Sequence, residues 1–136
     1  MHPLRKLRES GKATADQVRE LLAENVLFNS PILVRPIRGR DVIAAIFAQS
    51  SSTRGSGNYT AEFKLDDRTT FWRWVGTMDG HKIESFEVIV ENEQGLIEER
   101  SIALRPYPAV TLFRDSMYEL LKDKLPPDVW DYATTA

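Results

Sequence analysis

The sequence contains no cysteine, which excludes disulfide scaffolds, thiol nucleophiles, zinc ribbons and iron–sulfur clusters. Only two histidines are present, His2 beside the N-terminus and His81 at a predicted hairpin tip. Both are expected to be solvated and mobile, so neither a histidine-based triad nor a metal site is predicted. The 18 basic and 20 acidic residues nearly balance, so no strong overall field recruits nucleic acid or acidic lipid.

Long apolar runs are also missing. No stretch approaches the length of about 18 residues that a membrane span needs, and the basic start Met1–Arg8 is not followed by the apolar core of a signal peptide. We therefore expect a cytoplasmic protein with no membrane partner. The 42% hydrophobic and 28% charged residues are typical of a globular protein, and residues 1–136 are expected to form one domain.

The first half of the sequence predicts helices. Thr14 and Gln17 have the spacing of a capping box, and residues 18–22 continue with apolar side chains at helical spacing. Val26–Asn29 predicts a short strand. A second amphipathic helix begins near Asp41, and the small polar residues of Ser50–Gly57 then predict a mobile loop.

From Tyr59 onward, apolar and polar residues alternate, which predicts antiparallel strands. Asp79-Gly80 is a strong hairpin signal because a type I′ turn needs positive φ at both central positions. The predicted strands are Tyr59–Leu65, Thr69–Gly76, Lys82–Val90 and Leu96–Arg105. Pro106 and Pro108 end the sheet, and an amphipathic helix follows between Val110 and Leu121.

Turn positions fix which residues face each other across a hairpin. Two-residue turns at 66–67, 79–80 and 93–94 predict four pairs: Ala61 with Trp72, Trp72 with Glu87, Trp74 with Ser85, and Glu87 with Arg100. One face of the sheet therefore carries the row Trp72, Glu87 and Arg100 among large aromatic residues. The other face mixes apolar and charged side chains.

The row permits two interpretations. Indole beside a carboxylate raises the pKa of Glu87, whereas an opposed guanidinium lowers it. In the first, Glu87 acts as an acid or base in an aromatic cavity, and Arg100 is its partner or binds an anionic group of a ligand. In the second, Glu87 and Arg100 form a cross-strand ion pair. Such a pair stabilises a sheet by about 0.2–1 kcal/mol.

Three segments carry a resemblance to a known family: Leu21–Pro31, Pro36–Ile43 and Val88–Ile97. In their order and spacing the chain resembles the nuclear transport factor 2-like superfamily, in its SnoaL-like and ketosteroid-isomerase-like branch. The resemblance implies a cystatin-like α+β fold, in which a cone-shaped, curved antiparallel (mixed) β-sheet wraps around N-terminal helices. The last helix resembles an extension found in part of the superfamily. The resemblance also implies a hydrophobic pocket and a homodimer through the outer sheet face.

The positions that match the family's catalytic motif are mostly changed. The general-base Asp falls on Ser30 and the oxyanion Tyr near Lys6, whereas the protonated Asp falls on Glu87, which keeps the carboxyl. Steroid isomerisation by that mechanism is therefore not expected. The family's epoxide hydrolases use an Asp–Arg–Asp set, of which Glu87 and Arg100 supply a part.

We therefore predict a small-molecule pocket, with Glu87 and Arg100 as the candidate catalytic residues. The predicted lining residues are Ser30, Ile46, Phe47, Tyr59, Phe63, Trp72, Trp74, Ser85, Ile102 and Leu104. The function would be that of a cofactor-independent and metal-independent isomerase, cyclase or hydrolase of a hydrophobic substrate. The alternative is a non-catalytic ligand-binding or dimerisation module.

Overall fold

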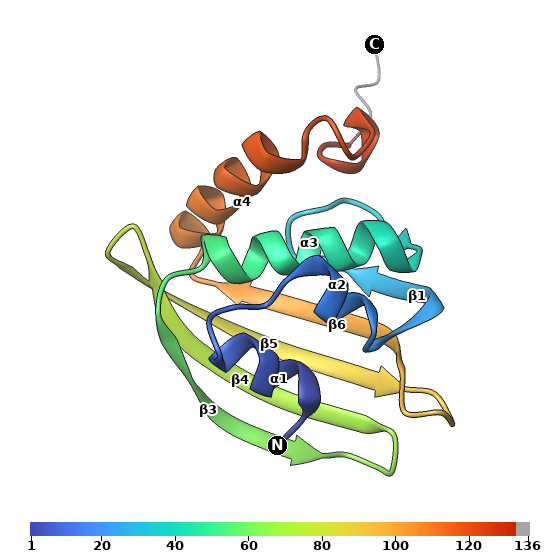
Figure 1. The fold of residues 1–136 in the computed structure, drawn as a ribbon. Helices are drawn as coiled ribbons and strands as arrows, with labels where there is room; N and C mark the ends of the chain where they lie inside the picture. Colours follow the sequence, from blue (N-terminus) through green and yellow to red (C-terminus); the bar gives the residue numbers. More distant parts are fainter. Residues whose placement is uncertain (133–136) are drawn as a thin grey trace.

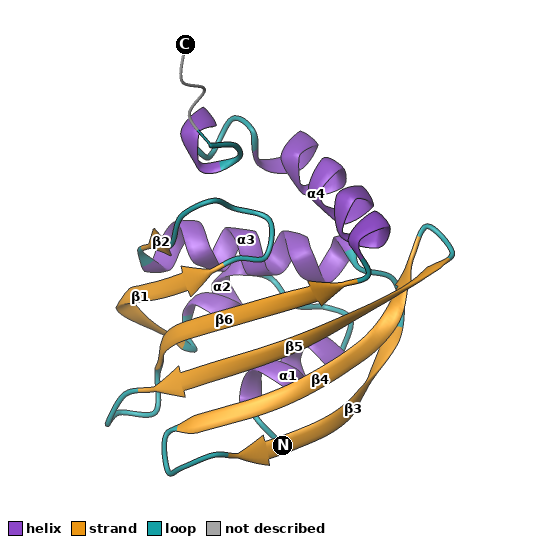
Figure 2. Cartoon of the chain, turned by 180° about the vertical axis from the view of Figure 1, so that it is seen from behind, coloured by secondary structure: helices purple, strands orange, loops and turns teal. Residues whose placement is uncertain are grey.

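The structure is a computed structural model that describes residues 1–132. In chain order its elements are α1 (Pro3–Glu9), α2 (Ala15–Arg19), β1 (Leu22–Asn29), β2 (Ile37–Arg38), α3 (Arg40–Thr53), β3 (Gly57–Lys64), β4 (Thr69–Met78), β5 (His81–Glu91), β6 (Ile97–Arg105), α4 (Tyr107–Leu121) and the short 3-10 helix η1 (Pro127–Val129). Helices α1, α2 and α3 cover one face of a curved sheet (Figure 1). None of the helices in residues 1–132 lies on the opposite face, as the view from behind shows (Figure 2).

The sheet has six strands in the order β2-β1-β6-β5-β4-β3. Strand β1 runs parallel to β6, and every other neighbouring pair is antiparallel. The predicted α+β fold with a curved mixed sheet and an additional C-terminal helix is therefore confirmed. None of the helices within the described residues has the length and apolar character that a membrane crossing requires.

Helix boundaries follow the local signals in part. The capping box is present at α2, where Thr14 Oγ1 accepts from the Gln17 amide and Gln17 Oε1 accepts from the Thr14 amide. The continuation of this helix through residues 18–22 is wrong, because Leu22 already begins β1 and pairs with β6. Helix α3 also runs further than predicted, to Thr53, so that only three residues connect it to β3.

The hairpin between β4 and β5 has the predicted register. Asp79 and Gly80 both adopt positive φ, and the two pairs Trp72 with Glu87 and Trp74 with Ser85 form. The next hairpin differs, since Glu87 lies opposite Ile102 and Arg100 lies opposite Ile89. A longer turn, closed by hydrogen bonds between Asn92 and Leu96, and an irregularity beside Val90 cause this two-residue shift. A shift of two keeps Arg100 on the same sheet face as Glu87.

Strand β3 contains the irregularity that overturns one predicted lining residue. Tyr59 pairs with Trp74, but an extra residue at Thr60 then places Glu62 opposite Trp72, in place of the predicted Ala61. A one-residue bulge exchanges the two faces of the strand beyond it. Phe63 consequently points to the outer face and is 61% exposed, so the prediction that it lines the pocket is wrong.

Candidate functional site

One carboxylate lies among three arginines in the space between the helices and the sheet. Glu87 on β5 faces Arg8 from α1, Arg54 from the segment after α3, and Arg100 from β6. Arg100 donates from Nε to Glu87 Oε1 at 3.0 Å and also from Nη2 to the same oxygen. Arg8 Nη1 and Arg54 Nη1 each lie 3.6 Å from Glu87 Oε2. We call these four residues the arginine cluster.

Ser85 completes the hydrogen bonding inside the arginine cluster. Its hydroxyl donates to Glu87 Oε2 at 2.7 Å and accepts from Arg54 Nη1 at 3.3 Å. Ser85 and Glu87 both lie on β5, two positions apart, so their side chains are on the same face of the sheet. Ser85, Glu87, Arg54 and Arg100 are buried, and the side chain of Glu87 has no exposed surface at all. The side chain of Arg8 is 8% exposed.

The electrostatics keep Glu87 ionised. Burial raises the pKa of a carboxyl, but the guanidinium groups of Arg100, Arg54 and Arg8, together with the hydrogen bonds from Arg100, hold the pKa of Glu87 well below its usual range. A carboxylate in this state is an anion that organises cations. It is not a proton donor at neutral pH.

Burial lowers the pKa of an arginine, whereas it raises that of a carboxyl. Loss of solvation, with repulsion from Arg8, lowers the pKa of Arg54 to about 9, so its guanidinium still carries a charge at neutral pH. Burial also lowers the pKa of Arg100. Tyr59 remains a neutral phenol, because burial raises its pKa.

His2 is buried, which corrects the expectation of a mobile terminal residue. Its Nδ1 accepts from the Leu4 amide and so caps α1, while its Nε2 lies 2.6 Å from Glu91 Oε1. The ring also meets the edge of Trp72. Burial lowers the pKa of His2, although Glu91 opposes that change.

Two cavities adjoin the arginine cluster instead of the single enclosed pocket that was expected. The larger has a volume of about 530 Å³ and opens beside α1 and the start of β3. Its lining residues are Arg8, Glu9, Gly11, Ser51, Arg54, Gly55, Ser56, Gly57, Asn58, Tyr59 and Trp74. The smaller is apolar, lies under α4, and has a volume of about 20 Å³, enough for about one water molecule. Arg54 borders both cavities.

Glycine explains how the wall of the larger pocket is built. A Cβ atom on Gly57 would lie 2.5 Å from the indole of Trp74, and one on Gly55 would lie 2.6 Å from the carbonyl oxygen of Thr77. Only glycine lets the chain between α3 and β3 pass so close to β4. This close passage carries Arg54 inward, where its guanidinium stacks 4.8 Å from the Trp74 ring.

The predicted lining residues divide among several places. Tyr59 and Trp74 line the larger pocket. The smaller cavity is lined by Ser30, Ile46, Ile102 and Leu104. Three others are buried but border neither cavity: Phe47, Trp72 and Ser85.

The predicted contact between Glu87 and Arg100 is present, but the sequence analysis missed Arg8 and Arg54. A signal for Arg8 existed, because it follows Leu4 by four positions and so shares the buried stripe of a short helix. A charged residue on such a stripe predicts a buried polar partner. Arg54 gave no comparable signal, since it stands alone in a small polar segment.

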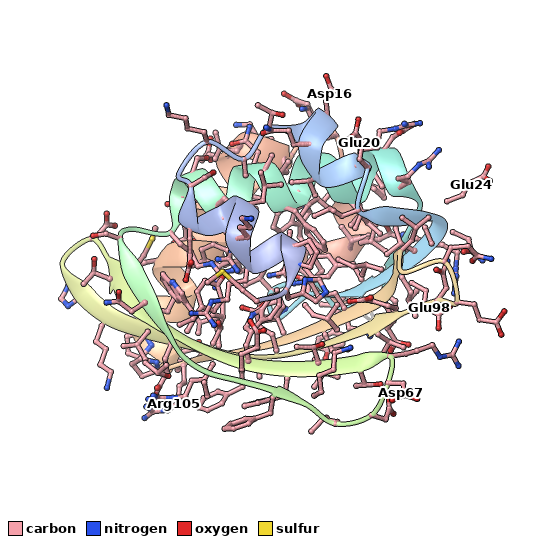
Figure 3. All side chains as sticks on the ribbon, turned by 60° about the horizontal axis from the view of Figure 1, so that its bottom comes forward. Asp16, Glu20, Glu24, Asp67, Glu98 and Arg105 are labelled. Carbon is pink, nitrogen blue, oxygen red and sulfur yellow. The ribbon has the colours of Figure 1, made fainter. Side chains whose placement is uncertain are left out.

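No second carboxylate joins Glu87 in any ion pair formed by residues 1–132. Glu98, the nearest candidate along β6, lies at the periphery of the molecule, as do Asp16, Glu20 and Asp67 (Figure 3). Within the same residues, no group of three His, Cys, Asp or Glu side chains is placed to hold a metal ion. The polar side chains in direct contact with Glu87 are therefore those of three arginines and Ser85.

The architecture and the pocket between sheet and helices define a class of fold, and solved structures share it. A Silicibacter pomeroyi protein with a cystatin-like fold is 24% identical, with a TM-score of 0.81 over 91% of this chain and 89% of that one. A steroid delta-isomerase from Pseudomonas aeruginosa is 17% identical, with a TM-score of 0.80 over 88% and 86%. The fold is thus cystatin-like, of the nuclear transport factor 2-like type, as the resemblance implied.

A third similar structure is SalBIII, an epoxide hydrolase/cyclase-like enzyme with a role in pyran ring formation in the polyether salinomycin. It is 15% identical, with a TM-score of 0.59 over 76% of this chain and 84% of that one. No protein-family model and no curated protein matches the sequence. At these identities the comparisons show the fold, and similar structures of that fold include an isomerase and a cyclase-like enzyme.

Proposed function

We propose that the protein binds a small organic molecule in the larger pocket, between α1 and the β3–β4 edge of the sheet. The observation that carries this proposal is an open space of about 530 Å³ that ends on buried charged groups. Pockets for small molecules usually measure about 300–1,000 Å³ and combine aromatic walls with a few fixed polar groups. Trp74 and Tyr59 supply the walls here, and Arg8 and Arg54 supply the polar groups.

Tryptophan fluorescence tests this proposal, because only one of the three tryptophans borders the larger pocket. Compounds found in a thermal-shift screen should quench the tryptophan fluorescence of the wild-type protein. Most of that quenching should be absent in Trp74→Phe. Trp130→Phe is the matched control, since Trp130 lies at the small cavity. If quenching persists in Trp74→Phe, or if no compound in a broad screen binds, the pocket has been assigned wrongly.

The mixed lining of the larger pocket bears on the class of ligand. The expected ligand was hydrophobic, but the mainly apolar cavity, at about 20 Å³, is too small for an organic molecule. The larger pocket offers aromatic surface on one side and cations on the other. A ligand with an apolar body and a polar end fits this combination better than a uniformly apolar one.

A cofactor-independent isomerase, cyclase or hydrolase is the second candidate, and the similar isomerase and cyclase-like structures favour it. Because Glu87 borders neither cavity, a substrate in that function would have to reach it past Arg8 and Arg54. The Glu87 carboxylate would then accept a proton from the substrate, and Arg100 would remain its partner. Glu87→Gln should then abolish turnover of an identified substrate while the folded variant still binds it. Unchanged turnover would remove Glu87 from the chemistry.

We also propose that two copies associate through the outer sheet face, in the cytoplasm. This face exposes Phe63 and Phe86, whose apolar surface a partner copy would bury. Sedimentation should give a dimer for the wild type and a monomer for Phe63→Asp. Tyr107→Asp serves as the control, because Tyr107 is exposed at the start of α4. A monomeric wild type would contradict the dimer.

A further inference from the structure

The arginine cluster carries more positive charge than its own residues neutralise. Glu87 supplies one negative charge, and Arg8, Arg54 and Arg100 supply three positive ones. The side chains of the three arginines are only 8%, 2% and 2% exposed. No other acidic side chain pairs with any of them in residues 1–132. Since a buried charge without a counter-charge is costly, a surplus of two cations calls for an anion.

Donors without acceptors lie on the same side of the cluster. Arg8 Nη1, Arg54 Nε and the Tyr59 hydroxyl are buried polar atoms that make no hydrogen bond within the described residues. Arg8 Nη1 is within ion-pair range of Glu87, but at 3.6 Å it is too far to donate to it. Buried polar atoms almost always find a partner, so three such atoms together indicate one that they share.

The residues that carry these groups border the larger pocket. Arg8, Arg54 and Tyr59 all line it, whereas Glu87 and Arg100 do not. Two of the three arginines therefore lie beside the pocket, whereas Glu87 and Arg100 lie deeper in the cluster. The one acidic lining residue is Glu9, whose carboxylate accepts from Arg5 Nε at 3.0 Å and is thereby paired.

We propose that Arg8, Arg54 and Tyr59 bind the anionic end, a carboxylate or phosphate, of the small-molecule ligand, with its apolar part against Trp74. The inference rests on the proposed function and specifies the ligand class. Guanidinium groups match these oxyanions because their N–H donors are planar and fixed in direction. Glu87 then acts by holding the arginines in place, not by exchanging protons with the ligand.

Matched pairs of probes test the proposal on the full-length protein. Phenylacetate is compared with its neutral counterpart phenylacetamide, and phenyl phosphate and inorganic phosphate form a second arm, all by calorimetry and thermal shift. Phenylacetate or phenyl phosphate should bind at least about tenfold more tightly than the amide, which corresponds to one charged hydrogen bond. The arm that binds more tightly distinguishes a carboxylate ligand from a phosphate ligand.

Two variants assign the effect to these residues. Arg8→Gln should weaken the binding of phenylacetate or phenyl phosphate by about tenfold, and Tyr59→Phe should weaken it by a smaller factor. The affinity for phenylacetamide should change little in both variants. Lys6→Gln is the control, because Lys6 is an exposed cation on the same helix that lines no pocket. Arg8→Gln should also keep or raise the melting temperature without ligand, since it removes surplus charge. A structural ion pair with Glu87 would instead lower it.

The possible failures are distinguishable. Equal affinity for phenylacetate and phenylacetamide, or undiminished anion binding in Arg8→Gln, overturns the anion site. If neutral compounds still quench Trp74 in that case, the proposed small-molecule function survives. If neither anions nor neutral compounds bind, both proposals fall.

Discussion

At the scale of single residues, Glu87 supplies the negative charge that stabilises the buried arginines. Within the part of the chain that the structure describes, it is the only carboxylate that pairs with three arginines. Removing one partner of a buried ionic set leaves uncompensated charge, which typically costs about 3–5 kcal/mol. Glu87→Gln should therefore lower the free energy of unfolding by about this amount, measured by urea denaturation at neutral pH. Asp67→Asn, at an exposed turn, should change it by less than about 0.5 kcal/mol.

The pH dependence follows from the same contacts. The folded protein holds the pKa of Glu87 well below its usual range, whereas the unfolded chain restores the value of about 4.3. A carboxyl with a depressed folded pKa stabilises the protein above its unfolded pKa, and that contribution is lost as the pH falls toward the folded pKa. Between about pH 5 and 3, stability should therefore fall less steeply in Glu87→Gln than in the wild type. Parallel curves would mean that Glu87 is not the ionised centre of the cluster.

At the scale of elements, local signals predicted what local interactions determine. The capping box at Thr14 and the turn at Asp79-Gly80 depend on a few neighbouring residues, and both form. The bulge at Thr60 and the longer turn after Asn92 depend on how whole strands pair, and no short sequence motif encodes them. This is why the predicted face of Phe63 was wrong. The predicted face of Arg100 was correct because the register of β5 and β6 differs from the prediction by two residues, which leaves the face unchanged.

The outward position of Phe63 makes a testable contrast with a neighbour on the inner face. Because Phe63 is mostly exposed in the single chain, Phe63→Ser should change the free energy of unfolding of the monomer by no more than about 0.5 kcal/mol. Ile89→Ala, at a fully buried position on β5, should cost about 2–5 kcal/mol. Urea denaturation at two protein concentrations separates this effect from dimer dissociation. A large loss in Phe63→Ser at both concentrations would contradict the β3 bulge.

At the scale of the whole molecule, the site is a product of tertiary assembly. Arg8, Arg54, Glu87 and Arg100 come from four segments, and the fold alone brings them together. Sheet register could predict Glu87 beside Arg100, since both stand on neighbouring strands. It could not predict two arginines from helical segments, because the packing of α1 and the end of α3 against the sheet depends on long-range contacts.

The C-terminal helix has its own role in this assembly, because it fills space that would otherwise be an apolar cavity. Phe113, Met117 and Leu121 of α4 are buried and line the cavity of about 20 Å³ beside α3 and β6. Helix α4 lies beside α3 (Figure 1), and its buried side chains fill most of the space next to α3 and β6.

Phe113→Ala should enlarge the small cavity beside α4. Loss of the buried ring should cost about 3–5 kcal/mol, because the surrounding side chains collapse only partly into the space. An enlarged dry cavity also binds benzene, as apolar cavities of this kind do, so benzene should raise the melting temperature of Phe113→Ala and leave the wild type unchanged. Leu120→Ala, an exposed position on the same helix, controls for helix propensity and should show neither effect. If Phe113→Ala is as stable as Leu120→Ala, α4 does not pack over this region in solution, and the apolar cavity would then be open to ligands as well.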